Sequence, residues 1–420
     1  MTESHSIPDL LLVLAAVLAT AKVLAALAQK IGQPAVLGEL LAGVLLGGSV
    51  FGLLDPTDPV IQALSELGVI ILLFEIGLHT DVRSIGKVFG AAVMVAIVGV
   101  ALPFFLGYGV AVGPLHLERI PALVCAAALT ATSIGISARV LSDIGQLNSR
   151  NGQVVLGAAV LDDIIGLIVL SVVSELASGG SWRVGGVVKL AVISVGFIVA
   201  ALVAGRFLAR PIFRSVETVN APGTLSALAL AFALVMSAIA ARSGSALILG
   251  AFSAGVILHT TDARAEIERS ATAIGHFLVP VFFASVGAAV KLSAFAEART
   301  LAVGGALIAV GVAGKYAAGY APWWFRGNKR LIGVAMIPRG EVGLIFAQTG
   351  LATRAITPSL FSAITLMVLV TTFIAPPWLA RLGVQRTSDR AGGDAGIDDL
   401  VAGDWGQRAS GTSSESSSSD

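Results

Sequence analysis

The chain has 420 residues, of which 56% are hydrophobic and 13% are charged, and its mean hydropathy is +0.90. Soluble domains contain roughly 45–50% apolar and about 25% charged residues, so this composition excludes a soluble globular protein. The formal net charge of +1 gives no reason to expect nucleic acid as a partner. Lipid is therefore the expected surroundings of most of the chain.

Long apolar runs recur along the sequence and are separated by charged, Pro-containing or Gly-rich breaks. A bilayer core about 30 Å thick needs about 20 apolar residues per helix, and the alternation typical of an outer-membrane strand is absent. We expect an all-α polytopic membrane protein with about thirteen transmembrane helices. The expected spans are 8–29, 34–54, 60–79, 86–113, 119–144, 150–178, 184–213, 223–241, 244–261, 272–294, 299–324, 329–351 and 357–380.

The placement of basic residues predicts how the chain is oriented, because short cytoplasmic loops retain Lys and Arg. Connections after odd-numbered spans carry most of them, including Lys30, Arg150 and Arg330. We therefore expect an inner-membrane protein with its N-terminus outside and its C-terminus in the cytoplasm. Residues 1–385 are the expected transmembrane domain, and residues 386–420, rich in Ser, Asp, Gly and Arg, are expected to form a disordered cytoplasmic tail.

Charged side chains in the middle of two expected spans mark a candidate site. Asp162 and Asp163 are adjacent in the sixth span, and Lys315 stands among small residues in the eleventh. A charge at the centre of a spanning helix costs roughly 2.5–3.5 kcal/mol even on the lenient insertion scale, so such residues are functional candidates. Neighbouring residues on a helix point about 100° apart, so one lysine cannot easily neutralise both acids. A salt bridge that only fastens two helices is the alternative for Lys315.

Two other spans are interrupted at membrane depth. The fifth contains Thr132 and Ser133 next to Gly, and the twelfth contains Arg339 and Glu341 beside Pro and Gly. Their numbers differ by seven, an odd offset, so two six-helix units joined by a seventh helix must have opposite orientations. Inverted repeats with one broken helix in each half indicate a transport site near the midplane. Arg339 and Glu341 can equally form a second structural ion pair, with Glu341 reaching Arg139 or another partner.

Four motifs in this order resemble the monovalent cation:proton antiporter-2 family, particularly its NapA-like sodium/proton antiporters. The similarity covers about residues 8–380. The motifs are Ala131-Thr132-Ser133, Leu161-Asp162-Asp163, Lys315 and Pro338-Arg339-Gly340-Glu341-Val342-Gly343-Leu344.

The resemblance implies a homodimer in lipid, with spans 1–3 and 8–10 forming a dimerisation part and spans 4–6 and 11–13 a moving core. It also implies roles for the candidate residues: Asp163 as the essential ion-binding carboxylate and Asp162 as the lysine-paired one. Thr132 and Ser133 would line the crossing of the broken spans, so that Na⁺ is held by Asp163, Asp162, Thr132 and Ser133. No cofactor or nucleotide is implied.

The function that follows is exchange of cytoplasmic Na⁺ or Li⁺ for external H⁺ by alternating access, in the service of pH homeostasis. If Na⁺ breaks the Asp162–Lys315 pair, Lys315 can lose a proton, and the exchange becomes electrogenic. Many relatives have Glu where His79 stands, and Glu75 is an unusual charge just before it. The roles of these two residues stay open.

Three other functions remain to be weighed. A potassium/proton antiporter would use the same scaffold, although the potassium-efflux branch generally has Gln where Asp162 stands and a nucleotide-binding domain. An ion channel would line its pore with the acid pair. An intramembrane aspartyl protease needs two carboxylates that face each other, which adjacent residues on one helix do not provide. We therefore expect a transporter and not an enzyme.

Overall fold

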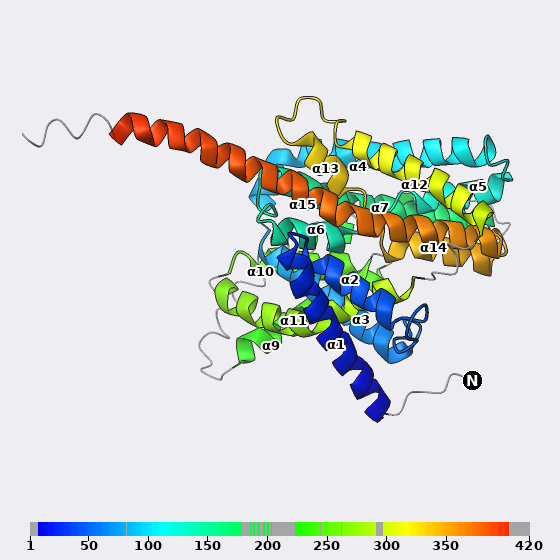
Figure 1. Cartoon of the computed structure of the whole chain (residues 1–420), viewed down its shortest axis with the longest axis horizontal. Coiled ribbons are helices and arrows are strands. Elements are labelled where there is room, and N and C mark those ends of the chain that lie inside the picture. Colours follow the sequence, from blue (N-terminus) through cyan, green and yellow to red (C-terminus); the bar gives the residue numbers. More distant parts are fainter. Residues whose placement is uncertain are drawn as a thin grey trace, which may run out of the picture.

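The computed structural model describes residues 7–80, 82–177, 223–243, 246–261, 263–290 and 297–402, with isolated positions between 185 and 203. In this part of the chain the regular elements are helices, and the β structure is an isolated bridge between Gly47 and Leu54. The expected all-α fold is confirmed (Figure 1). The helices are α1 (Ile7–Lys30), α2 (Ala35–Leu46), α3 (Pro59–Leu78), α4 (Val82–Val112), α5 (Arg119–Ala128), α6 (Ile134–Asp143), α7 (Arg150–Ala177), α9 (Thr224–Arg242), α10 (Leu247–Leu258), α11 (Arg264–Ala288), α12 (Ala298–Ala318), α13 (Lys329–Ala335), α14 (Glu341–Ala352) and α15 (Pro358–Ala402).

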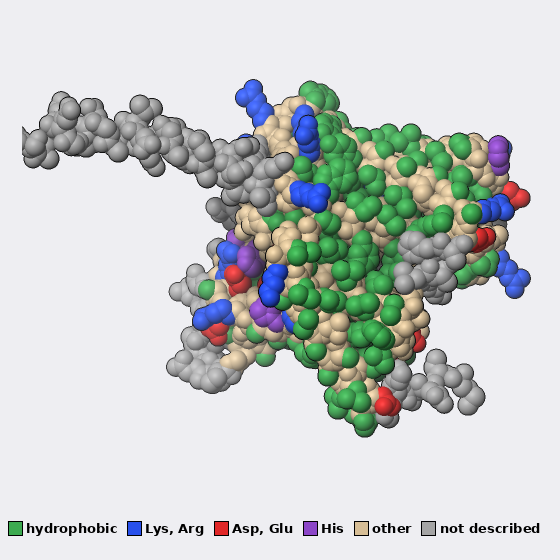
Figure 2. Space-filling view, viewed as in Figure 1, with side chains coloured by type: hydrophobic (Ala, Val, Ile, Leu, Met, Phe, Trp, Pro, Cys, Tyr) green, Lys and Arg blue, Asp and Glu red, His purple; other side chains and the backbone are tan. Residues whose placement is uncertain are grey.

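Among the described residues, eight helices are long and apolar enough to cross a membrane. Each expected span coincides with one helix or with a pair of half-length helices, except the seventh, 184–213, which lies outside the described residues apart from isolated positions. Figure 2 shows apolar side chains over the middle of the visible face, with charged groups mostly toward the ends of the helices. The chain is a multi-pass membrane protein.

Several boundaries differ from the expected ones: α2 ends at Leu46 and not near residue 54, and α12 ends at Ala318 and not near residue 324. Helix α11 begins at Arg264 and not near residue 272, because the polar turns that precede the apolar stretch continue the same helix. Helix α15 extends to Ala402, so residues 386–402 of the expected tail belong to its backbone, while residues 403–420 lie outside the described part. In Figure 1 this end of α15 projects well beyond the other helices.

The helices pack as two groups (Figure 1). In the first, which we call the α3 group, α3 packs against α10 and α11, and α2 packs against α1 and α11; α9 packs against α10. In the second, the crossing group, α4 packs against α7 and α12, and α15 packs against α12 and α14. The crossing group also contains α5, α6 and α13, so it holds both pairs of half-length helices.

Glycines let two pairs of helices in the α3 group cross at very short distance. A Cβ added to Gly287 of α11 would lie 2.1 Å from the carbonyl oxygen of Leu40 in α2, and one added to Gly255 of α10 would lie 2.2 Å from that of Phe74 in α3. Helices α2 and α3 are the second and third spans of the first half, and α10 and α11 are those of the second half. The two crossings are thus the same contact made twice, as an internal repeat requires.

We predict that Gly255→Ala destabilises the protein by about 1–3 kcal/mol, because backbone atoms of α3 must move to admit the methyl group. The matched control is Gly90→Ala in α4, where an added Cβ meets nothing within 4 Å. That change should be neutral or slightly stabilising, since Ala favours a helix over Gly by about 1 kcal/mol. Thermal unfolding of the purified protein in detergent measures both, and an equal effect of the two variants would contradict the close crossing.

Candidate functional site

The fifth span is broken between α5 and α6. Helix α5 ends at Ala128 and α6 begins at Ile134, which leaves a short extended segment at membrane depth. The hydroxyl of Thr130 donates to the carbonyl of Ala127 at 2.7 Å. Thr and Ser interrupt helices in this way, because their side chains compete with the backbone for hydrogen-bonding groups. The break leaves carbonyl groups at the end of α5 and N–H groups at the start of α6 without helical partners.

The twelfth span is broken in the same way between α13 and α14. Helix α13 ends at Ala335, and α14 begins at Glu341. Pro338 lies in the gap; it has no N–H to continue a helix, and it disfavours the helical conformation of the residue before it. Gly340 is pressed against the other break, because an added Cβ would lie 2.8 Å from Oγ of Ser133.

The start of α6 supplies donors to the end of α13. The N–H of Ser133 donates to the carbonyl of Pro338 at 2.8 Å, and Oγ1 of Thr132 donates to that of Met336 at 3.2 Å. One turn further along α6, Oγ of Ser137 donates to the carbonyl of Ala335 at 2.5 Å. The crossing of the two broken spans is therefore held by the backbone groups that each break exposes.

Arg339 completes the crossing from the other side. Its side chain is fully buried, and Nη1 donates to the carbonyl of Ala131 at 2.6 Å, so the guanidinium binds the end of the α5 segment. The hydroxyl of Thr372 in α15 donates to the backbone carbonyl of Arg339. Within the described part of the chain, Nε and Nη2 have no hydrogen-bond partner, and the absence of a side chain at Gly311 leaves room beside Nη2. A buried guanidinium thus lies at the crossing, and two of its nitrogen atoms have hydrogen-bond donors that no described residue accepts.

The acid pair lies in the middle of α7. Asp162 is 0% exposed and Asp163 is 8% exposed. Nζ of Lys315, which is also fully buried, donates to the two carboxylate oxygens of Asp162 at 3.0 and 3.3 Å. Lys315 reaches α7 from α12, where the neighbouring Gly314 lies against Pro103 of α4. The pair therefore joins α7 to α12, and α4 packs against both helices.

These charges share one buried region of the crossing group. Asp163 lies within electrostatic range of Lys315, and Asp162 lies within range of Arg339. Two acidic and two basic side chains therefore share this buried region, so a change in the charge of one affects the others.

Comparison with known proteins identifies the family. Residues 13–385 match the family described as sodium/hydrogen exchanger, transmembrane. The chain is 40% identical over 389 residues to the high-affinity Na⁺/H⁺ antiporter NhaS3 of Synechocystis sp., covering 83% of this chain and 84% of that protein. The chain belongs to the sodium/hydrogen exchanger family.

Two further relatives extend the comparison. The Na⁺/H⁺-K⁺ antiporter GerN of Bacillus cereus is 31% identical over 376 residues, covering 87% of this chain and 94% of that protein. The sodium proton antiporter MjNhaP1 of Methanocaldococcus jannaschii superposes with a TM-score of 0.71 at 15% identity, covering 91% and 98% of the two chains. The last likeness shows the fold, and the relatives are named as ion antiporters, so this exchanger family member is a transporter and not an enzyme.

In this exchanger the expected residues take definite places. Asp162 and Lys315 are in direct contact, while Thr132 and Ser133 lie at the crossing and are linked to the charged groups through the segment that carries Arg339. Nε of Arg139 pairs with Asp143 at 3.3 Å, and the expected contact of Arg139 with Glu341 stays a prediction. The side chain of Glu341 itself lies outside the described part.

Sequence reasoning missed Thr372. A threonine in an apolar helix usually donates to a carbonyl of its own preceding turn, as Thr371 does to Met367 at 2.8 Å, so Thr372 carried no signal of a contact with Arg339. Glu75, whose role stayed open, accepts a hydrogen bond from Thr272 at 2.7 Å, and so links α3 to α11.

We predict that Asp162→Asn destabilises the exchanger by about 3–5 kcal/mol, because it leaves the Lys315 cation buried without its countercharge. The double variant Asp162→Asn with Lys315→Met should regain most of that loss, since both charges are then removed together. Thermal unfolding in detergent compares the two variants. If the double variant is as unstable as the single one, the buried pair is not the source of the destabilisation.

Proposed function

We propose that this exchanger is a secondary active antiporter that moves cytoplasmic Na⁺ or Li⁺ out of the cell in exchange for external H⁺. The observation that carries the proposal is the buried Asp162–Lys315 pair with Asp163 adjacent to it, in the group that holds the two broken spans. The names of NhaS3 and GerN support the same exchange. The placement of Lys and Arg supports an inner membrane location with the N-terminus outside and the C-terminus in the cytoplasm.

Asp163 is the proposed shared binding group. A sodium ion that leaves water needs oxygen ligands, and a carboxylate offers oxygen and charge together. Asp162, Thr132 and Ser133 would supply further oxygens, while Arg339 and Glu341 act as supporting charges at the crossing. Because a buried carboxylate is costly without a countercharge, Asp163 would hold either Na⁺ or H⁺. Competition for one group then couples the two ions.

Lys315 would make the exchange electrogenic. If Na⁺ also binds Asp162, the Lys315 ammonium loses its partner while its side chain is fully buried, and a buried unpaired cation is strongly unfavourable. Release of its proton removes that unpaired charge. Each Na⁺ would then displace more than one proton.

Alternating access would come from movement of the crossing group against the α3 group, which serves as the fixed dimerisation part of a homodimer. The crossing group carries the acid pair, Lys315 and both breaks, so the site can travel as one unit. Helix α1 of the α3 group exposes Leu11, Leu12 and Leu27, an apolar face that a second copy and lipid would share.

Potassium is the second candidate cargo, because the name of GerN includes K⁺ beside Na⁺. The fold and the charged groups would be the same, and the ion preference would depend on how many oxygens surround Asp163 and how far they can adjust. The transport measurement below includes both ions for this reason.

We predict that purified protein in liposomes collapses an imposed pH gradient when Na⁺ or Li⁺ is added, and that Asp163→Asn abolishes this exchange. The assay follows a pH-sensitive dye, with K⁺ added in a parallel experiment. Glu66→Gln, which alters an exposed carboxylate of α3, is the control and should retain exchange.

Three results would change or overturn the proposal. Exchange that persists in Asp163→Asn places the ion site elsewhere. A response to K⁺ alone assigns the protein to potassium transport. Ion flux that is not coupled to protons and does not saturate would indicate a channel.

A further inference from the structure

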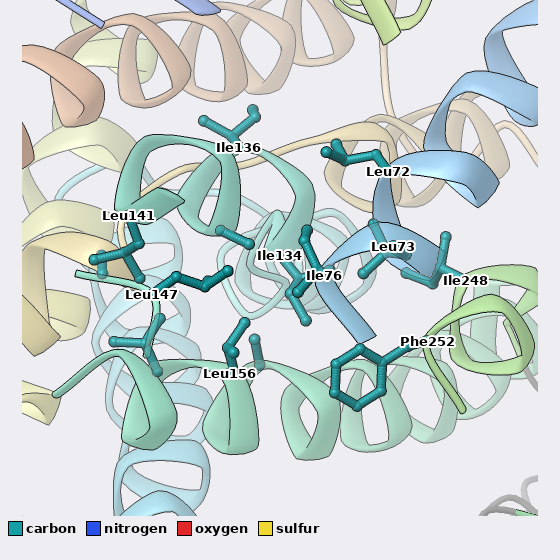
Figure 3. Close-up of a cluster of buried hydrophobic side chains, with 14 of the residues drawn as sticks. Leu72, Leu73, Ile76, Ile134, Ile136, Leu141, Leu147, Leu156, Ile248 and Phe252 are labelled. Atoms are coloured by element: carbon teal, nitrogen blue, oxygen red, sulfur yellow. The ribbon is translucent and has the colours of Figure 1, made fainter. Parts of the chain in front are cut away.

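The loop between α12 and α13 exposes two adjacent tryptophans. Trp323 is 73% exposed and Trp324 is 49% exposed, and their rings meet edge to face with centroids 4.5 Å apart. Large apolar side chains inside the protein instead share buried clusters, as Figure 3 shows for Leu73, Ile134 and Phe252. The two indole rings therefore present an apolar surface that the described part of the chain leaves uncovered.

The same loop leads into a group of cationic side chains. Arg326 and Arg330 are exposed, and Lys329 precedes Arg330 at the start of α13. Among the described residues, none of the three forms an ion pair with a carboxylate. Their own stretch of chain offers few partners, because residues 298–388 contain one acidic side chain, that of Glu341 at the start of α14. The positive charge at this end of α12 and α13 is therefore not neutralised by neighbours in sequence.

Hydrogen bonds with α7 and α13 fix the shape of this loop. The N–H of Asn328 donates to the side-chain oxygen of Asn151 in α7 at 2.9 Å, and the side-chain oxygen of Asn328 accepts from the N–H of Leu331 at 3.1 Å and so caps α13. Nζ of Lys329 donates to the carbonyl of Trp323 at 3.1 Å. The loop therefore holds its cations and its indole rings close together on one surface.

Tyrosines of α12 extend the aromatic part of this surface. Tyr320 is 43% exposed, and its hydroxyl lies 3.1 Å from that of Tyr316, whose ring stacks on Trp378 of α15 with centroids 5.5 Å apart. Figure 2 shows Lys and Arg side chains beside apolar ones where the loop between α12 and α13 lies in Figure 1. We call the exposed set the aromatic–cationic patch, and it consists of Tyr320, Trp323, Trp324, Arg326, Lys329 and Arg330.

An anionic phospholipid is the partner whose chemistry fits the whole patch. Tyr and Trp favour the headgroup depth of a bilayer, where one side of the ring is apolar and the other is hydrated. Clustered Lys and Arg just outside a spanning helix attract lipids with a net negative charge. A free phosphate ion would use the cations alone and leave the rings exposed, and a zwitterionic lipid would gain less from charge that is not neutralised.

We propose that the aromatic–cationic patch binds anionic phospholipids, with their phosphate groups at the cations and their upper acyl chains against the indole rings. The proposed orientation places the patch at the cytoplasmic leaflet. Helix α12 carries Lys315, and α13 leads to the break at Pro338, so a lipid bound where they join stabilises the part of the crossing group that holds the site. The inference does not depend on the proposed antiport.

The first test is thermal unfolding of the purified full-length protein in neutral detergent with added phosphatidylglycerol or phosphatidylcholine. Phosphatidylglycerol should raise the unfolding temperature more than phosphatidylcholine does, and glycerol phosphate, which has no acyl chains, should not replace it. In the double variant Arg326→Gln with Arg330→Gln, the lipid concentration that gives half of the shift should rise roughly tenfold to thirtyfold. The reason is that each Lys or Arg near an anionic surface contributes about a fivefold gain in binding.

The matched control is Arg119→Gln with Arg299→Gln. These two exposed arginines lie in the first turns of α5 and α12, at the end of the crossing group away from the patch. The control should respond to phosphatidylglycerol as the wild-type protein does. Equal shifts with the two lipids in the wild-type protein, or an equal loss in both double variants, would overturn the proposal.

A second test detects the contact directly, because lipids with brominated acyl chains quench the fluorescence of a tryptophan that they touch. In phosphatidylcholine liposomes, brominated phosphatidylglycerol should quench the wild-type protein more than the same amount of brominated phosphatidylcholine. The variant Trp323→Phe with Trp324→Phe should lose that difference. No difference in the wild-type protein, or a difference that survives in the variant, would overturn the patch. Neither test measures transport, so failure of both would leave the proposed antiport standing.

Discussion

The helices of two spans are interrupted at membrane depth. The rest of the site depends on which groups form hydrogen bonds with the helix ends at these breaks. In lipid no water is present to bind a loose N–H or carbonyl group, so each end must find a partner inside the protein. The breaks serve each other: the N–H of Ser133 binds the carbonyl of Pro338, and the guanidinium of Arg339 binds the carbonyl of Ala131. A site of polar backbone groups can therefore exist at membrane depth only because the two breaks cross.

The same crossing places the partial charges of four helix ends beside the proposed cation site. Helix ends carry partial charges, positive at the starts of α6 and α14 and negative at the ends of α5 and α13. Beside them, Asp162 is fixed by Lys315, while Asp163 is the carboxylate that the proposed mechanism leaves exchangeable. The adjacent positions on one helix separate the two roles, because one acid is turned toward α12 and its neighbour toward another face. Binding, release and electrical balance are thus proposed to arise from four side chains.

The sequence predicted those parts of the candidate site whose residue types are unusual in a membrane-spanning helix. Asp162, Asp163 and Lys315 are visible because charges are rare in apolar spans, and the breaks are visible because Pro, Gly, Ser and Thr interrupt helices. What it could not predict is contact over long separations: Thr132 meets Met336 across 204 positions, and Arg339 meets Ala131 across 208.

The central claim is that Na⁺ and H⁺ compete for Asp163. Its most direct test is to add Na⁺ to purified protein in weakly buffered detergent solution and to measure the protons that appear. The account predicts saturable proton release that diminishes as the starting pH rises and the site is already deprotonated, and that is lost in Asp163→Asn. Saturable Na⁺ binding without proton release, or equal release from the Asp163→Asn protein, would contradict it.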